Sequence, residues 1–354
     1  MRAWIGALAA LVLLQGPPAW AEQSAWEQVW RSESAADDMT MVGRAQTMTA
    51  GDGRSLSATA EVSAAKGKVR LDYRTDRRRW SLIDDGRRLI WLQPRDKTAL
   101  VQERRSLAID RGLAERNYSA REAGEGTIAG RKVIAIEILP REGGQVVQRL
   151  WLDRGTGFAL KRERYNAEAR LISGTEYLEV EFGRPVAADI FEAPAGWRIE
   201  GPAASETRSS IAELSKRLGF EVRPPQYLPR GYELLGGYEQ RRGRRHMQSA
   251  ELRYTDGLRL MSVFERPRTE EEGRGLGRQH GGRARGGGHG RGGGGRGRGE
   301  GGRGHRGMGP PMADLTVNDR ATEKIVRYLG PHLVVYVVGD LAADEIVRVA
   351  KSVD

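Results

Sequence analysis

The sequence predicts a mainly antiparallel α+β protein, in which a large curved half-barrel sheet with few helices precedes a smaller α/β domain. From residue 39 onward, much of the chain alternates apolar and polar residues with a period of two. This alternation is typical of half-buried strands. Short turns join most of these segments, which favours antiparallel neighbours in one sheet. With 354 residues, the chain is long enough for two domains.

Residues 1–21 have the features of a signal peptide. Arg2 supplies a positive start, residues 7–14 form an apolar run, and small residues occupy positions 19 and 21. The run is shorter than the roughly 20 residues of a membrane span. The chain has no cysteine, so it cannot carry a lipid anchor on cysteine. We therefore expect an exported, soluble periplasmic protein without a membrane anchor; the alternative is an uncleaved helix lying on the membrane.

Residues 22–200 are predicted to form the first domain. A short helix is expected at residues 25–34, and strands begin near Met39. Asp84-Asp85-Gly86 predicts a hairpin turn in which the glycine supplies a positive φ. Polar residues 106–116 favour a second helix. A second group of strands is expected at 132–139, 145–153, 158–165 and 170–182, and residues 189–194 close the domain.

Residues 201–209 are polar and predict a linker to a second, smaller α+β domain at residues 210–354. Its first helix is expected at 210–218. Its last helix, at 344–352, has Asp340 as a candidate cap at its entrance. The strands between them are expected at 233–239, 248–254 and 258–264, near Leu315 and Ile325, and at 333–338.

A Gly/Arg/His-rich tract at residues 268–311 interrupts the second domain. Between residues 273 and 309 we count nine arginines and one glutamate, a local charge of +8 out of the total of +11. The tract has almost no apolar residues, so burial cannot offset the entropy cost of ordering it. We expect a disordered loop between two strands, and a folded remainder that is close to neutral.

The composition of this tract resembles Arg-Gly segments that bind single-stranded nucleic acid. It contains no aromatic residue for stacking on bases, and the chain is expected to be exported. We therefore expect no nucleic-acid partner. Anionic components of the cell envelope are candidate partners through screened attraction, and a solvated spacer without a partner is the alternative.

The sequence offers no catalytic residue, metal site or cofactor motif. Three of the five histidines lie in the tract, and His246 and His332 have no partner at metal-ligand spacing. Glu176, Glu179 and Glu181 suggest hydrolytic carboxylates, but their alternation with apolar residues favours the solvated face of a strand. We expect a protein that is not an enzyme, with an exported hydrolase as a minor alternative.

Aromatic and aliphatic residues on neighbouring strands of the first domain suggest an apolar cavity. A large sheet with few helices leaves one face to be filled by side chains or by a ligand. A lipid or acyl chain suits such a face, and ordinary core packing is the alternative. The candidate residues are Leu71, Tyr73, Trp80, Leu89, Trp91, Trp151 and Tyr165.

Several segments resemble the periplasmic sigma-E factor regulatory protein family of the RseB/MucB type. In the second domain these are PPQYLPRGYELLGGYE (224–239), LRYTDGLRLMSVFE (252–265) and VVYVVGDLAADEIVRVAKSV (334–353). In the first they are MVGRAQTM (41–48), RLDYRTDRRRWSLIDDGRRLIWLQP (70–94) and ADIFEAPAGW (188–197). The tract has no counterpart in the family pattern. The resemblance implies a LolA-like first domain.

The resemblance also implies a regulatory sensor of envelope stress. Such proteins bind the periplasmic region of a membrane anti-sigma factor, and lipid or mislocalised lipoprotein in the first-domain cavity weakens that binding. The second domain and the interdomain surface are the expected partner sites, with candidates Tyr232, Tyr254, Asp256, Gly257 and Phe264. A lipoprotein or lipid carrier of the LolA type, without a signalling partner, is the alternative.

Deleting residues 273–309 should leave both domains folded, because the tract contributes no apolar core. We expect thermal unfolding followed by circular dichroism to be as cooperative as in the full chain. A variant without a cooperative transition would contradict this expectation.

Overall fold

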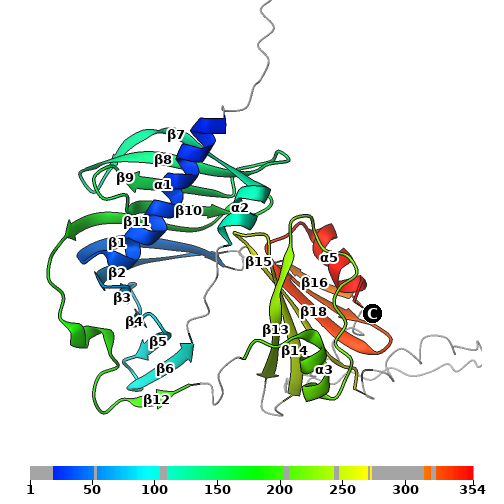
Figure 1. The fold of residues 1–354 in the computed structure, drawn as a ribbon. Helices are drawn as coiled ribbons and strands as arrows, with labels where there is room; N and C mark the ends of the chain where they lie inside the picture. The colour runs from blue at the N-terminus through cyan, green and yellow to red at the C-terminus, as the bar shows by residue number, and fades with distance from the viewer. Residues whose placement is uncertain are drawn as a thin grey trace, which may run out of the picture.

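The structure is a computed structural model that describes residues 19–51, 54–103, 110–201, 207–242, 247–269, 272, 315–319 and 324–353. It contains two antiparallel sheets with few helices around them (Figure 1). The predicted fold class, a large curved sheet followed by a smaller domain, is confirmed. Most of the Gly/Arg/His tract lies outside the described residues.

The first sheet has twelve strands and is antiparallel except for its short parallel edge pair, β12 with β6. β1 lies near its middle and pairs with β2 on one side and β11 on the other. In sheet order the strands are β12 (Arg198–Glu200), β6 (Thr98–Glu103), β5 (Arg88–Gln93), β4 (Arg79–Asp84), β3 (Lys68–Arg74), β2 (Arg54–Ala65), β1 (Met41–Gly51), β11 (Leu171–Phe182), β10 (Ala159–Tyr165), β9 (Gln148–Asp153), β8 (Arg131–Pro140) and β7 (Tyr118–Ile128).

Helix α1 (Ala19–Asp38) crosses one face of the sheet over β7 to β10 (Figure 1). Its stacked Trp26 and Trp30 pack, together with Val29, on the buried side chains of β8 and β9. Glu33 of α1 forms an ion pair with Arg162 of β10 at 2.6 Å. These contacts show which face of the sheet α1 covers. The helix is longer at both ends than the predicted 25–34.

The opposite face of β4 to β6 is covered by the chain that follows β11. The 3-10 helix η1 (Ala188–Phe191) places Phe191 on buried Ile83, Ile90 and Leu92. Trp197 and Ile190 pack on the same cluster. The other face of these strands is not covered by this segment, which matters for the candidate site.

The second sheet has six strands and is covered on one face by two helices. α3 (Ile211–Leu218) begins at a capping box formed by Ser210 and Glu213, and α5 (Ala343–Lys351) ends the domain. Their apolar sides join a core that includes Leu214, Leu252 and Ile346. In sheet order the strands are β13 (Glu233–Arg242), β14 (Met247–Thr255), β15 (Leu260–Pro267), β18 (Leu333–Gly339), β17 (Lys324–Leu329) and β16 (Leu315–Asp319).

Two helix ends differ from the sequence predictions. Asp340 is not the cap of the last helix: the N-cap is Ala342, which has no side chain able to bond the free N–H groups. Asp340 instead faces the other domain, as described below. The helix predicted at 106–116 is α2 (Arg111–Asn117), capped by Asp110, whose side chain accepts the N–H of Leu113.

Within the described residues, no helix is long and apolar enough to span a membrane. The segment predicted to be a signal peptide lies almost entirely outside those residues.

Candidate functional site

Five of the seven predicted cavity residues share one face of β3 to β5. Tyr73 pairs with Trp80, and their rings stack with centroids 5.0 Å apart. Leu71 pairs with Leu82, which in turn pairs with Trp91, and Leu89 lies two residues before Trp91. All of these side chains are half-buried. They form a continuous apolar surface, which we call the aromatic face.

The aromatic face lies on the same side of the sheet as α1 but beyond its reach. Tyr73 pairs with Ala60 of β2, and Ala58, two residues earlier on β2, pairs with Thr47 of β1. This pairing continues through β11 to Arg162, which contacts α1. Trp80, Leu89 and Trp91 belong to none of the four buried clusters of the described residues. Leu71 and Tyr73 pack against the cluster of β1 and β2, whereas Trp80, Leu89 and Trp91 offer apolar area that the packed cores do not use.

Arginines border one end of the aromatic face. The β3–β4 hairpin places Arg74, Arg77, Arg78 and Arg79 around a depression of about 460 Å³. The hairpin itself is held by Thr75, whose hydroxyl oxygen accepts the N–H of Arg78 at 3.0 Å. Arg74 and Arg79 alternate along their strands with Tyr73 and Trp80, so their side chains lie on the other face of the sheet from the aromatic pair.

Trp151 and Tyr165 lie on β9 and β10, outside the aromatic face. Trp151 packs against the same buried cluster as Leu71 and Tyr73. The Lys161 ammonium lies 4.7 Å from its ring centroid. Burial and the hydrogen bond that Tyr165 donates to Glu163 raise the pKa of Tyr165 to about 12. The aromatic face thus comprises five of the seven residues predicted for an apolar cavity, and Trp151 borders it through a shared core.

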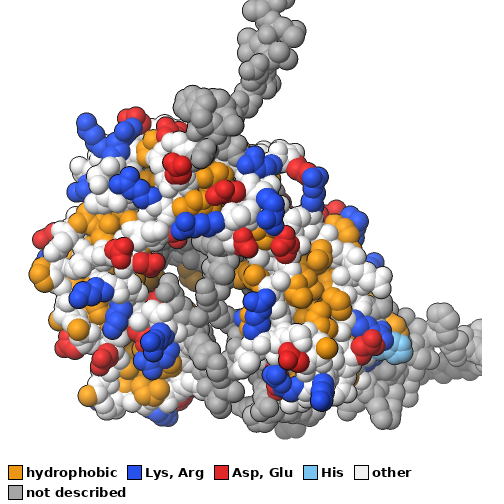
Figure 2. Space-filling model, in the orientation of Figure 1, with side chains coloured by type: hydrophobic (Ala, Val, Ile, Leu, Met, Phe, Trp, Pro, Cys, Tyr) orange, Lys and Arg blue, Asp and Glu red, His pale blue; other side chains and the backbone are white. Residues whose placement is uncertain are grey.

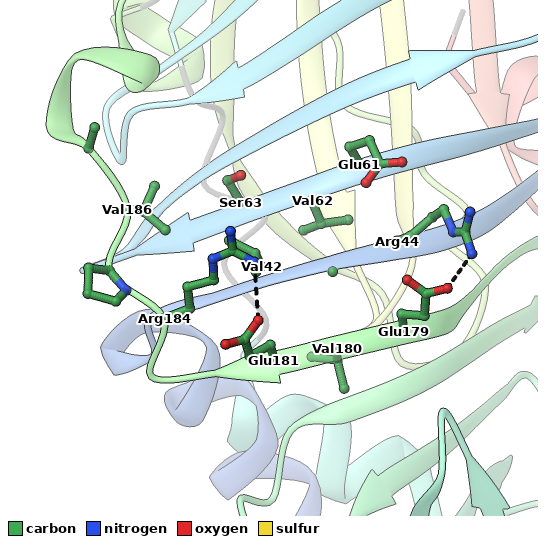
Figure 3. Close-up of a pocket in the computed structure, with 13 residues that line it drawn as sticks. Val42, Arg44, Glu61, Val62, Ser63, Glu179, Val180, Glu181, Arg184 and Val186 are labelled. Atoms are coloured by element: carbon green, nitrogen blue, oxygen red, sulfur yellow. Dashed lines mark hydrogen bonds and ion pairs between the residues drawn. The ribbon is translucent and has the colours of Figure 1, made fainter.

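A polar groove of about 530 Å³ lies between β1, β2, β11 and the segment after β11 (Figure 3). Arg44 pairs with Glu179, and Arg184 pairs with Glu181 at 3.2 Å. Glu61 adds a further carboxylate to its wall. Glu179 and Glu181, considered above as hydrolytic carboxylates, therefore serve as ion-pair partners. The charged lining does not suit an acyl chain.

The second domain contacts the first through the turn between β14 and β15. Asn117, at the end of α2, donates from its side-chain amide to the carbonyls of Gly231 and Asp256, each at 2.9 Å. Tyr118, the first residue of β7, donates its hydroxyl to the Asp256 carboxylate. Tyr118 is buried, and burial together with the Asp256 charge raises its pKa far above the ordinary value. We call this contact region the domain seam.

Arg259 lies in the seam among acidic and phenolic groups. Burial works against its charge, but Tyr118, Asp340 and Asp256 together raise the pKa of the guanidinium. Its Nε lies 3.7 Å from a carboxylate oxygen of Asp340. Burial raises the pKa of Asp340, although Arg259 and the backbone N–H of Ala167 oppose this shift.

A second contact of the seam involves the turn between β10 and β11. Lys324 of β17, which is buried, donates to Glu168 of that turn at 2.9 Å. Burial of Glu168 opposes ionisation, but the hydrogen bond and charge of Lys324 outweigh it and lower the pKa of Glu168.

The five predicted partner-binding residues are all buried. Asp256 and Gly257 lie in the seam, and Tyr232 packs beside them. Tyr254 belongs to the core of the second domain, and Phe264 is 9% exposed. A partner can reach Tyr232, Asp256 and Gly257 only after a rearrangement of the seam.

Sequence reasoning missed the first-domain half of the seam, namely Asn117, Tyr118 and Glu168. The only local signal was the turn Asp256-Gly257, which predicts a hairpin but not what the hairpin contacts. Among the described residues, no group of three His, Asp or Glu side chains is arranged to hold a metal ion.

Comparison with known proteins supports the resemblance found in the sequence. Residues 59–195 match the family described as the MucB/RseB N-terminal domain. The chain is 29% identical over 150 residues to the sigma factor AlgU regulatory protein MucB of Pseudomonas aeruginosa. That alignment spans 42% of this chain and 44% of the relative. Residues 59–195 of the first domain are thus similar to the MucB/RseB N-terminal domain, as the sequence resemblance predicted.

Solved structures extend the likeness of fold to both domains. A MucB chain from the MucA/MucB complex of Pseudomonas aeruginosa matches with a TM-score of 0.62 and 20% identity, covering 92% of this chain and 97% of that one. MucB in complex with MucA(peri) matches with a TM-score of 0.59 and 20% identity, covering 93% and 97%. The two-domain arrangement of this chain is therefore that of a MucB-like fold.

Replacing Glu168 by Gln should weaken the seam at neutral pH. Because the folded-state pKa of Glu168 lies below 4.5, its contribution is fully present above that pH and is lost as the pH falls through the folded-state value. We expect a loss of at most about 1 kcal/mol at pH 7, because the carboxylate is partly exposed. Urea unfolding at pH 7 and pH 3 measures the difference.

The wild type and Glu168→Gln should converge in stability at the acidic pH. As a control, Glu181→Gln removes an exposed ion pair that lies within one domain and should change little at either pH. A difference between wild type and Glu168→Gln that is unchanged at pH 3 would contradict the assignment.

Proposed function

We propose that this protein is an exported, periplasmic regulator that binds the periplasmic region of a membrane anti-sigma factor and thereby modulates envelope-stress signalling by a sigma factor. The observation that carries the proposal is the MucB-type first domain, together with a fold that follows MucB through both domains. MucB is described as regulating the sigma factor AlgU and has been solved bound to MucA(peri). The role is not enzymatic.

The second part of the proposal is that the aromatic face binds a lipid or an acylated protein. Its half-buried rings and leucines provide apolar contacts along three neighbouring strands. Each acyl methylene buried there would contribute roughly 0.8 kcal/mol. The polar groove is lined by carboxylates and arginines, so the aromatic face is the better acyl site.

Regulation requires that ligand and partner prefer different arrangements of the molecule. A coupling of roughly 1–3 kcal/mol between the two binding events is the usual range. Asp256 and Gly257 fit this requirement, since they become accessible only when the seam changes.

A lipoprotein or lipid carrier without a signalling partner is the second candidate function, and the aromatic face favours it equally. In either function the arginine-rich tract would contact anionic envelope components through its local charge of +8. No nucleic-acid partner is proposed.

Affinity capture from solubilised membranes of the native bacterium separates the two functions. The tagged full-length protein should retain an anti-sigma protein with one membrane span, identified by mass spectrometry. Binding should be reproduced with that protein's purified periplasmic region. Recovery of lipoproteins without any anti-sigma protein would contradict the regulator and favour the carrier.

Replacing Trp91 by Asp should reduce binding of a fluorescent fatty acid by tenfold or more, because a charge would enter the aromatic face at a cost well above 1.4 kcal/mol. The matched control is Trp197→Asp, a tryptophan-to-aspartate change in the cluster on the other face of β4 to β6, which should leave binding near the wild-type level. Fluorescence titration measures both. Equal losses in the two folded variants, or none in Trp91→Asp, would place the ligand elsewhere.

A further inference from the structure

The tip of the β14–β15 turn enters the first domain. Leu258, which is partly buried, packs against the buried cluster that α1 forms with β8 and β9, so a second-domain side chain contacts a first-domain core. Gly257 beside it has φ +100° and lies against α2. A Cβ on Gly257 would lie 2.3 Å from the backbone nitrogen of Ala114. Only glycine allows this approach, because both the backbone conformation and the space exclude a side chain.

The turn is held rigid by its own side chains. One oxygen of Asp256 accepts the N–H groups of Leu258 at 3.0 Å and Arg259 at 2.7 Å. The Thr255 hydroxyl accepts the N–H of Gly257 at 3.0 Å and donates to the Arg259 carbonyl at 2.9 Å. The turn therefore keeps its shape without the first domain, and little conformational entropy is lost when it enters.

The first domain supplies a matching socket made of α2 and the start of β7. Asn117 holds the backbone on both sides of the insertion, at Gly231 and Asp256. One carboxylate oxygen of Asp256 accepts hydrogen bonds within the turn, and Tyr118 donates to the other. A Cβ on Gly231 would lie 2.6 Å from the Asn117 side chain, so a second glycine allows this close fit.

We propose that residues 256–258 form a plug, and that withdrawal of this plug from the α2–β7 socket is the step by which the two domains separate. The plug contributes the apolar and backbone-to-backbone contact of the seam. The ion pairs Arg116–Glu233 and Arg230–Glu142 lie at its exposed rim and contribute little. Lys324 also contacts Glu168, whose carboxylate is partly exposed, and Asp340 accepts the backbone N–H of Ala167.

Spin labels on two introduced cysteines test the plug in the full-length protein. The chain has no native cysteine, so Arg87→Cys and Lys216→Cys give one exposed label in each domain. Pulsed electron paramagnetic resonance then reports the distance between the labels. We expect one narrow distribution for the otherwise unchanged protein.

Gly257→Ala should broaden the distribution and shift it to longer distances, because the added Cβ cannot share the socket with α2. The matched control is Gly124→Ala: Gly124 also has a positive φ of +119°, but nothing lies within 4 Å of its Cβ position. The control carries a similar backbone penalty and should keep the narrow distribution.

Leu258→Ser adds no atom near α2 and should broaden the distribution in the same direction. If Gly257→Ala disturbs the second domain itself, near-ultraviolet circular dichroism would detect the change, and Leu258→Ser then tests the plug. A narrow, unshifted distribution in folded Leu258→Ser, or equal broadening in Gly124→Ala, would overturn the proposal. These outcomes do not depend on any anti-sigma partner, so they are separate from failure of the proposed function.

Discussion

The insertion of one turn of the second domain into the core of the first is the contact on which the rest of the arrangement depends. Leu258 packs against an apolar cluster under α1, and Tyr118 and Asn117 satisfy the polar groups that accompany it. Without this insertion, two separately stable sheets would be joined by a polar linker and a few rim ion pairs. With it, the orientation of the domains is fixed by packing.

This contact explains why the residues expected to bind a partner are buried. The Asp256 carboxylate and the Gly257 backbone both contact the first domain. A partner that needs this surface must compete with α2 and β7 for it. Binding and domain separation are then one equilibrium, and a ligand that shifts the first domain shifts the partner affinity as well.

The sequence predicted the strands well because alternation and turn residues act locally. Val69, Leu71 and Tyr73 lie on one face as expected, and Asp256-Gly257 makes the expected hairpin. Alternation within a strand does not say which face that strand shares with distant ones, so it left open how Trp151 lies relative to Trp80 and Trp91. That relation depends on register and on bulges such as the one between Ala159 and Lys161.

The seam was beyond sequence reasoning for a different reason. Its partners, such as Tyr118 and Asp256, are separated by 138 positions, and each is an ordinary residue in its own segment. Asp340 illustrates the same limit: its position before the last helix predicted a cap, but it faces Arg259 and the first domain.

Differential scanning calorimetry of the full-length protein and of Leu258→Ser tests the coupling of the domains most directly. If the plug joins the two cores, the wild type unfolds in one transition whose calorimetric and van't Hoff enthalpies agree, and Leu258→Ser unfolds in two. Two independent transitions in the wild type, unchanged by Leu258→Ser, would contradict the proposed coupling of the two domains by the plug.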